Sequence, residues 1–268
     1  MDEDEPKRPF FLIVIDEDRG VFSVEGPMVD PKFRSFVGRW AVPYVYGLTC
    51  GELAQMINGE RWIEHPCKLT VVPMKGWKRS MVWRDTGLPW VPTSPHVPQG
   101  DSAMFQVATG MLGELGGIST GIGYTLPFQC IAAPNLDAHK TAEALNSYHL
   151  PGLRFKPITY KPYYFAFKDK QIAGVQVFFT EPSRAPLAAL NIYALEALRK
   201  VCGRDLFAEV ASSTNRSTNR IFSMFDKVNG TDATRKALQA GQSASEVVAS
   251  WKPGEDAFRK TRKAYLLY

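Results

Sequence analysis

The pattern of apolar and polar residues in the first hundred positions predicts a strand, a helix and a second strand. The apolar runs Phe10–Ile15 and Leu69–Met74 are typical of buried strands. Between them, Thr49 and Glu52 have the spacing of a capping box, which predicts the start of a helix. Because this order makes a βαβ unit, we expect the two strands to lie parallel in one sheet, with Glu52–Asn58 packed on it.

The pattern changes near Asp101 to a mixture of helices and strands. We expect helices over 102–115, 136–150, 185–200, 231–240 and 244–251, followed by a basic C-terminal helix, and strands over 155–160 and 175–179. The chain is therefore predicted to have an α/β fold. Residues 1–100 would form the C-terminal part of a Rossmann-like domain with a partial parallel sheet, and residues 101–268 a smaller α+β domain.

The two ends of the chain carry separate expectations. The first strand begins only ten residues from Met1, after a charged lead-in over 1–9, which predicts a sheet without its earlier strands. Such a sheet would expose an apolar edge beside Phe10–Ile15, so we expect a homo-oligomer or another partner to cover it. At the other end, Ala264–Tyr268 is too apolar for a free tail, and we expect it to pack into the protein.

Composition narrows the classes of function. The chain has 268 residues, 45% of them hydrophobic, which is enough for a packed core. The net charge of +5 is scattered, without a basic block interleaved with aromatics, so no nucleic-acid partner is expected. No apolar run approaches the length of a membrane span. The acidic start predicts no signal peptide, and the chain as given is expected to be cytoplasmic.

Neither the cysteines nor the histidines predict a metal site. The four cysteines are widely spaced without a CxxC pair, and the four histidines form no HxH or HExxH pattern. The glycine-rich segment 116–123 lacks the GK[ST] ending of a phosphate loop, so we expect its glycines to serve tight turns beside a cleft. No cofactor and no metal are expected.

Glu25 is the first candidate for chemistry. It lies in a predicted loop at the carboxyl end of the first strand, where open α/β sheets bind ligands. One interpretation is a surface carboxylate with a local hydrogen bond. The other is a general acid or base, which requires a buried carboxyl group with a raised pKa or a second carboxylate.

The long segment Lys75–Gly100 is the second candidate, since loops of this length are usually functional. It holds Trp77, Trp83, Trp90, Ser94 and His96. The tryptophans either fill the core or form an aromatic wall, which would suit the C–H faces of sugar rings. Ser94 lacks the G-x-S-x-G context of a serine hydrolase.

Five segments of the chain are characteristic in their sequence and order: VEGPMVDPKFRSFVG, YGLTCGELAQMING, LTVVPMKGWKRSMVWRDTGLPWVPTSPHVP, PGLRFKPITYKP and RKAYLLY. Together they resemble the DUF1343 family of exo-β-N-acetylmuramidases (NamZ type, glycoside hydrolase family 171). The resemblance implies a Rossmann-like domain with the active site, a C-terminal domain over one side of it, and release of terminal N-acetylmuramic acid from peptidoglycan fragments. It also implies a location in the cell envelope or outside the cell.

The resemblance also implies site residues. Glu25 of the VEGP motif corresponds to a proposed catalytic carboxylate of the family. The candidate substrate-binding residues are Arg34, Trp77, Trp83, Trp90, Ser94, His96, Thr120 and Tyr124. We expect Glu25 to face a cleft that also receives the loop Trp77–His96 and the segment Ile118–Tyr124. A muramic-acid-containing glycan is the expected partner.

The chain departs from the family pattern at three places. The family's upstream Pro-Glu-His-Gly motif has no counterpart here, Asp16–Gly20 replaces Asp-Arg-Pro-Asn-Pro, and Thr120 and Ile122 stand where many members have Glu and Arg. These departures leave two functions open. One is a glycoside hydrolase with weak turnover. The alternative is a truncated or degenerate homologue that binds cell-wall glycans without cleaving them.

Overall fold

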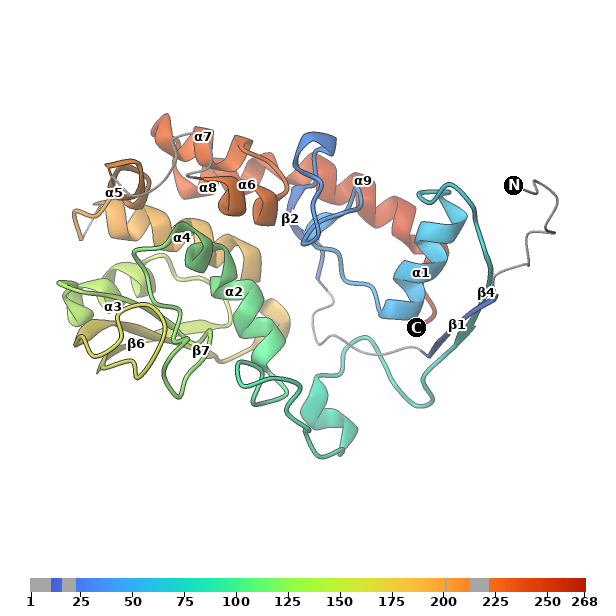
Figure 1. Ribbon diagram of the computed structural model, residues 1–268, viewed down its shortest axis with the longest axis horizontal. Coiled ribbons are helices and arrows are strands. Elements are labelled where there is room, and N and C mark those ends of the chain that lie inside the picture. Colours follow the sequence, from blue (N-terminus) through green and yellow to red (C-terminus); the bar gives the residue numbers. More distant parts are fainter. Residues whose placement is uncertain (1–10, 16–22, 201, 213–221) are drawn as a thin grey trace, which may run out of the picture.

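The computed structural model describes residues 11–15, 23–200, 202–212 and 222–268 (Figure 1). Strand β1 (Phe11–Ile15) pairs in parallel with β4 (Lys68–Val72). Helix α1 (Cys50–Gly59), opened by the capping box that the sequence predicts, contacts both strands. The parallel βαβ unit is therefore confirmed. Within the described residues this sheet has two strands, which makes it smaller than a Rossmann-like sheet.

Some expectations concern parts of the chain that the structure does not describe. The lead-in 1–9 and the segment Asp16–Gly20 lie outside the described residues, and only the backbone of β1 is described. The predicted apolar edge beside β1, with a partner to cover it, therefore stays a prediction.

Two further sheets are antiparallel. Strand β2 (Glu25–Met28) pairs with β3 (Pro43–Val45), and their register is irregular between Glu25 and Met28. In the other sheet, β7 (Ile172–Phe179) lies between β5 (Cys130–Ala133) and β6 (Leu153–Tyr160). The expectation that Glu25 lies in a loop was wrong, because Glu25 begins β2. The short strand contains Gly26, at φ 102°, and Pro27. Because both residues are unfavourable inside strands, the sequence lacks the alternating pattern that would predict one.

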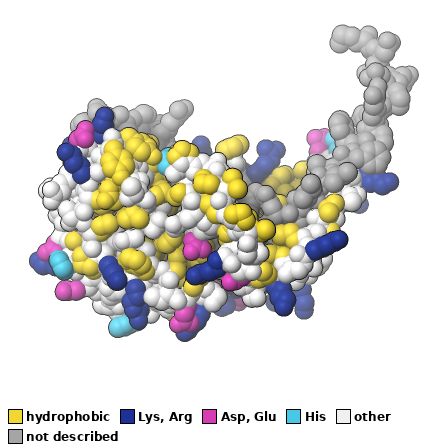
Figure 2. Space-filling view, turned by 90° about the horizontal axis from the view of Figure 1, so that it is seen from below, with side chains coloured by type: hydrophobic (Ala, Val, Ile, Leu, Met, Phe, Trp, Pro, Cys, Tyr) yellow, Lys and Arg dark blue, Asp and Glu magenta, His cyan; other side chains and the backbone are white. Residues whose placement is uncertain are grey.

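The helices of the second half agree with most of the predicted spans. They are α2 (Ser102–Leu115), α3 (Ala138–Ser147), α4 (Leu187–Lys200), α5 (Leu206–Ser212), α6 (Ser223–Asn229), α7 (Ala233–Gln239), α8 (Ala244–Ser250) and α9 (Lys252–Arg262). Helices α2 and α4 pack together, and the buried Asn191 of α4 donates a hydrogen bond to the Val107 carbonyl of α2 at 3.0 Å. On the face shown in Figure 2, Lys and Arg are scattered and form no stripe.

Helix α9 returns to the first part of the chain. Figure 1 shows it reaching from the β2 side of the molecule toward α1, with the C-terminus beside α1. Phe258 of α9 is 4% exposed and packs in one hydrophobic cluster with Val24, Leu48 and Met56. Residues from both ends of the sequence therefore share one core.

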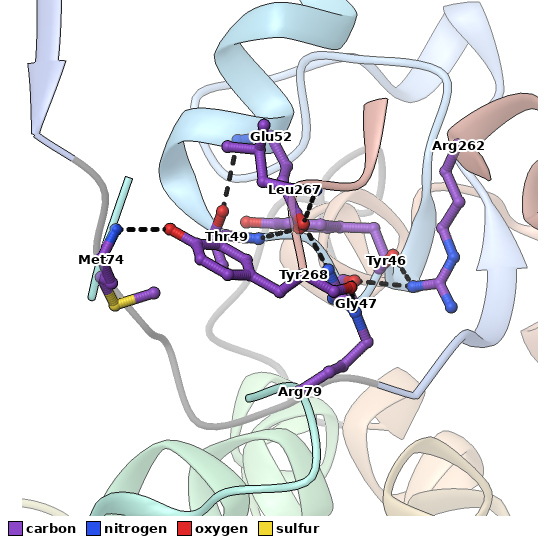
Figure 3. Close-up of polar contacts among 9 residues, drawn as sticks. All are labelled: Tyr46, Gly47, Thr49, Glu52, Met74, Arg79, Arg262, Leu267 and Tyr268. Carbon is purple, nitrogen blue, oxygen red and sulfur yellow. Dashed lines mark hydrogen bonds and ion pairs between the residues drawn. The ribbon is translucent and has the colours of Figure 1, made fainter. Parts of the chain in front are cut away.

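A buried carboxylate holds this junction together (Figure 3). Glu52 has no exposed surface. Its Oε2 accepts a hydrogen bond from the Thr49 amide at 2.9 Å, and its Oε1 accepts from the Leu267 amide at 2.8 Å and from the Arg79 guanidinium. We call Thr49, Glu52, Arg79 and Leu267 the Glu52 cluster. It joins helix α1, the segment 75–100 and the C-terminus.

Tyr268 adds a second set of contacts beside the cluster. Its hydroxyl accepts a hydrogen bond from the Met74 amide at 2.7 Å, and its ring meets the edge of Trp77 at 4.7 Å. The prediction that Ala264–Tyr268 packs into the protein is confirmed. The packing relies on polar and aromatic contacts, because Tyr265 and Leu266 are half-buried and Leu267 is 39% exposed.

Deletion of residues 264–268 should lower the melting temperature clearly. It removes the Leu267 amide from the buried Glu52 carboxylate and the Tyr268 hydroxyl from the partly buried Met74 amide. A polar group that loses its partner in a buried site costs about 1–3 kcal/mol. The measurement is thermal unfolding followed by circular dichroism. Leu267→Ala is the matched control, because it keeps the amide and changes an exposed side chain. Equal melting temperatures for the deletion and the wild type would contradict this anchoring.

Candidate active site

Glu25 lies where β2 meets the first turn of α4. Val24 before it is buried in the core, so the alternation along the strand turns Glu25 to the opposite side. Its Oε1 accepts a hydrogen bond from the Ala189 amide at 2.7 Å. The first amides of a helix lack partners within the helix, so Glu25 satisfies one of them from a distant strand. The side chain therefore has a structural contact in addition to any chemical role.

Burial dominates the electrostatics of Glu25. It raises the pKa of the carboxyl group to about 7, although the amides of Leu187, Ala188 and Ala189 favour the charged form. The nearby charge of Glu255 raises the pKa further. A carboxyl group that titrates near neutral pH can donate or accept a proton, which is the property required of a general acid or base.

Glu255 of α9 is the carboxylate beside Glu25, and it is fully engaged. Its Oε1 accepts a hydrogen bond from the Gly26 amide at 3.0 Å, and its Oε2 lies 3.3 Å from Nη2 of Arg259. Arg259 also donates to the Val24 carbonyl at 2.6 Å. We therefore interpret Glu255 as an anchor between α9 and β2 whose charge also raises the pKa of Glu25.

Tyr44 connects Glu25 to a large groove. The groove has a volume of about 830 Å³ and lies between Tyr44 of β3, the C-terminal half of α2, the glycine-rich segment and α6. We call it the Tyr44 groove. Burial raises the pKa of the Tyr44 phenol well above its usual value, with further contributions from Glu114 and then Glu25. Glu25 does not line the groove, whereas Glu114 does.

Glu114 is therefore a second carboxylate in electrostatic range of Tyr44. It lies near the end of α2, and burial raises its pKa also. The sequence pattern does not single out Tyr44, Glu114 or Glu255. Nothing in their spacing separates them from other residues, since they are gathered by the packing of α9 against β2 and β3 and by the contact of Tyr44 with α2.

The glycine-rich segment forms part of the groove wall, as expected for turns beside a cleft. Thr120 is 5% exposed and lines the groove with Ile118 and Ile122. Gly121 has φ 91°, and a Cβ there would lie 1.9 Å from the Leu126 carbonyl oxygen, so only glycine fits.

Tyr124 lies outside the groove lining. Its ring stacks on Tyr160 with centroids 4.5 Å apart. Tyr160 in turn shares a hydrogen bond of 2.8 Å with the Ser119 hydroxyl. Tyr124 therefore supports the wall that carries Ser119.

The segment 75–100 does not line the Tyr44 groove. Trp77 is buried against Tyr268, Trp83 meets Trp90 edge to face at 5.0 Å, and the Ser94 hydroxyl accepts the His96 amide at 3.2 Å.

Two contacts bring this segment close to the groove and to Glu25. His96 Nε2 lies 2.9 Å from the Tyr164 hydroxyl, next to Phe165 of the groove. A second cavity of about 380 Å³ is lined by Arg79 together with Ser23 and Leu187. Ser23 lies two positions before Glu25 in the chain, and the Leu187 amide is close to the Glu25 carboxyl group. Arg34 lies elsewhere, in a separate hollow.

The described residues contain no group of three His, Cys, Asp or Glu side chains placed to hold a metal ion. Nor does any helix in the described part combine the length and hydrophobicity needed to cross a membrane.

Comparison with protein families gives two matches. The model described as "Exo-beta-N-acetylmuramidase NamZ, N-terminal" matches residues 5–101, and the one described as "Exo-beta-N-acetylmuramidase NamZ, C-terminal" matches residues 106–268. The chain is also 34% identical over 260 residues to the peptidoglycan beta-N-acetylmuramidase NamZ of Bacillus subtilis (strain 168). That alignment covers 97% of this chain and 59% of the relative.

Two solved structures of DUF1343 family proteins from Bacteroides fragilis NCTC 9343 have similar folds. One has a TM-score of 0.88 and 40% identity, and covers 96% of this chain and 66% of its own. The other has a TM-score of 0.64 and 27% identity, and covers 96% and 65%. The chain thus spans less than two thirds of the length of these relatives.

The raised pKa of Glu25 predicts a specific dependence of stability on pH. From pH 4.5 to about 7 the unfolded chain releases the Glu25 proton while the folded chain keeps it, so the free energy of unfolding falls as the pH rises. Glu25→Gln accepts the Ala189 hydrogen bond without titrating. As the pH rises from acidic to mildly alkaline, the free energy of unfolding of the variant should therefore increase relative to that of the wild type. The expected change in this difference is on the order of 3 kcal/mol.

Urea unfolding at several pH values measures this difference. Glu143→Gln, at an exposed position, should follow the wild type throughout. A constant stability difference between wild type and Glu25→Gln across the range would show that burial does not shift the pKa of Glu25.

Proposed function

The chain belongs to the family of NamZ-type exo-β-N-acetylmuramidases, and from this premise we propose that it releases terminal N-acetylmuramic acid from peptidoglycan fragments. The observation that carries the proposal is the buried Glu25 carboxyl group, whose pKa of about 7 suits proton donation at neutral pH. Glycosidases of the two-carboxylate type need such an acid beside the scissile bond.

Glu114 is proposed as the partner carboxylate. It lines the Tyr44 groove, and Tyr44 is in electrostatic range of both acids. Glu25 does not line the groove, so in this arrangement the leaving oxygen must reach past Tyr44 to be protonated by Glu25. Glu114 either activates water or stabilises the positive charge that develops on the sugar ring. Tyr44 would hold the sugar between them.

The other site residues receive distinct roles. Thr120 contacts the sugar in the groove, while Tyr124 and His96 position the groove walls through Tyr160 and Tyr164. The Trp83–Trp90 pair and Ser94 would contact glycan beyond the groove, and Trp77 would hold the loop against Tyr268. Arg34 lies outside this site, in its own hollow.

The proposal includes the division of the chain. Residues 1–100 would be the C-terminal part of a Rossmann-like domain, and residues 101–268 the α+β domain beside it. Support comes from the parallel pairing of β1 with β4 and from the boundary between the two matched family models at 101–106.

One observation favours glycan binding without cleavage as a second candidate. Thr120 and Ile122 stand at the groove where the family resemblance implies Glu and Arg. A wall without those charges can still bind a sugar by shape and hydrogen bonds, but it offers fewer groups to stabilise charge in a transition state.

Glu25→Gln should abolish release of the leaving group from a chromogenic N-acetylmuramic acid glycoside, while the circular dichroism spectrum stays unchanged. Wild-type turnover is expected to be low and to decline above about pH 7, since Glu25 must be protonated. Glu114→Gln should also lose most turnover, and Glu143→Gln should keep it. Robust turnover by Glu25→Gln would refute the role of Glu25. Sugar binding by a wild type without turnover would favour the second candidate.

A further inference from the structure

We propose that the hollow around Trp40 and Trp62 is a second glycan-binding site, which takes a carboxylate-bearing sugar of the same glycan chain. We call it the Trp40–Trp62 hollow. It has a volume of about 310 Å³ and is lined by Arg34, Ser35, Arg39, Trp40 and Trp62. The identity of the ligand rests on the proposed function, whereas the existence of the site rests on the side chains themselves.

The two tryptophans provide a fixed aromatic surface. Their rings stack with centroids 5.9 Å apart and planes inclined by 22°, and both rings pack against the cluster that contains Leu48 and Phe258. Trp40 comes from the connection between β2 and β3, and Trp62 follows α1. The rings are thus held by the core while they line the hollow, and an indole can pack against the C–H face of a sugar.

The two arginines provide positive charge to the hollow. Among the described residues neither Arg34 nor Arg39 forms an ion pair, whereas Arg204, Arg235 and others pair with carboxylates. The Arg39 guanidinium lies 5.4 Å from the ring centroid of Trp40, which restricts its position. A preorganised guanidinium binds a carboxylate through two parallel hydrogen bonds.

Ser35 adds a polar group whose hydrogen-bonding capacity is unused among the described residues. Its hydroxyl oxygen is shielded from solvent and has no hydrogen-bond partner within the described part of the chain. The backbone of Ser35 is satisfied by Gly38 in both directions. Since buried hydroxyl groups normally have partners, a small shift of the turn that exposed this oxygen to the hollow would let a sugar hydroxyl or a carboxylate satisfy it.

The hollow adjoins the Tyr44 groove. The tight turn Ser35–Gly38 carries Ser35 on the side of the hollow and Val37 on the side of the groove. At the tip of the turn Phe36 is fully exposed and Val37 is 54% exposed. A glycan chain bound in the groove could therefore cross this turn and place a further residue on the tryptophans. Such an arrangement favours polymeric substrates over single sugars.

Isothermal titration of the full chain with N-acetylmuramic acid tests the site. The wild type should bind it at least tenfold more tightly than N-acetylglucosamine, which lacks the carboxylate. Arg34→Gln/Arg39→Gln should lose this preference, and added salt should weaken binding to the wild type. Arg184→Ala, which removes another exposed arginine, is the matched control. Equal binding by the double variant and the wild type would overturn the site, as would displacement of the sugar by inorganic phosphate at equal concentration.

A second measurement separates this site from the active site. With peptidoglycan fragments the double variant should show a higher KM and an unchanged kcat, and with the chromogenic monosaccharide it should match the wild type. An equal loss of kcat on both substrates would overturn the accessory role. If no variant turns over any substrate, the proposed function fails, while the titration still decides whether the hollow binds a carboxylate-bearing sugar.

Discussion

The architecture depends on one carboxylate that has no access to water. A buried charge is tolerated only when hydrogen bonds and an opposite charge compensate it. Glu52 obtains this compensation from the Thr49 amide, the Arg79 guanidinium and the Leu267 amide. These partners come from three separate parts of the chain. Compensating the charge therefore fixes the position of α1, of the segment 75–100 and of the C-terminus relative to one another.

Fixing the C-terminus also fixes α9, and with it the electrostatics of the site. Glu255 and Arg259 of α9 bind the backbone of Gly26 and Val24 on either side of Glu25. The two glutamates then differ in a simple way. Glu255 is paired with Arg259, whereas Glu25 accepts hydrogen bonds from amides at the start of α4 and has a raised pKa. A structural anchor and a titrating group thus lie side by side, and within the described residues the anchor is the one that forms an ion pair.

Local patterns predicted much of the fold. The parallel strands, the capping box of α1 and most helices of the second half follow from periodicity and from Thr49 and Glu52. Strand β2 was missed because Gly26 and Pro27 conceal its alternation. At the candidate site, the sequence indicated Glu25 and Thr120. It could not indicate Tyr44, Glu114 or Glu255, since their relation to Glu25 arises from long-range packing.

The contact between Glu255 and Gly26 joins residues separated by 229 positions. Closing a loop of that length costs conformational entropy, and a chain on the ribosome cannot form the contact until α9 has been synthesised. The helices and sheet of residues 102–200 can pack first, because they contact one another without α9. The full environment that raises the pKa of Glu25 therefore cannot form before α9 has been made and has docked on β2.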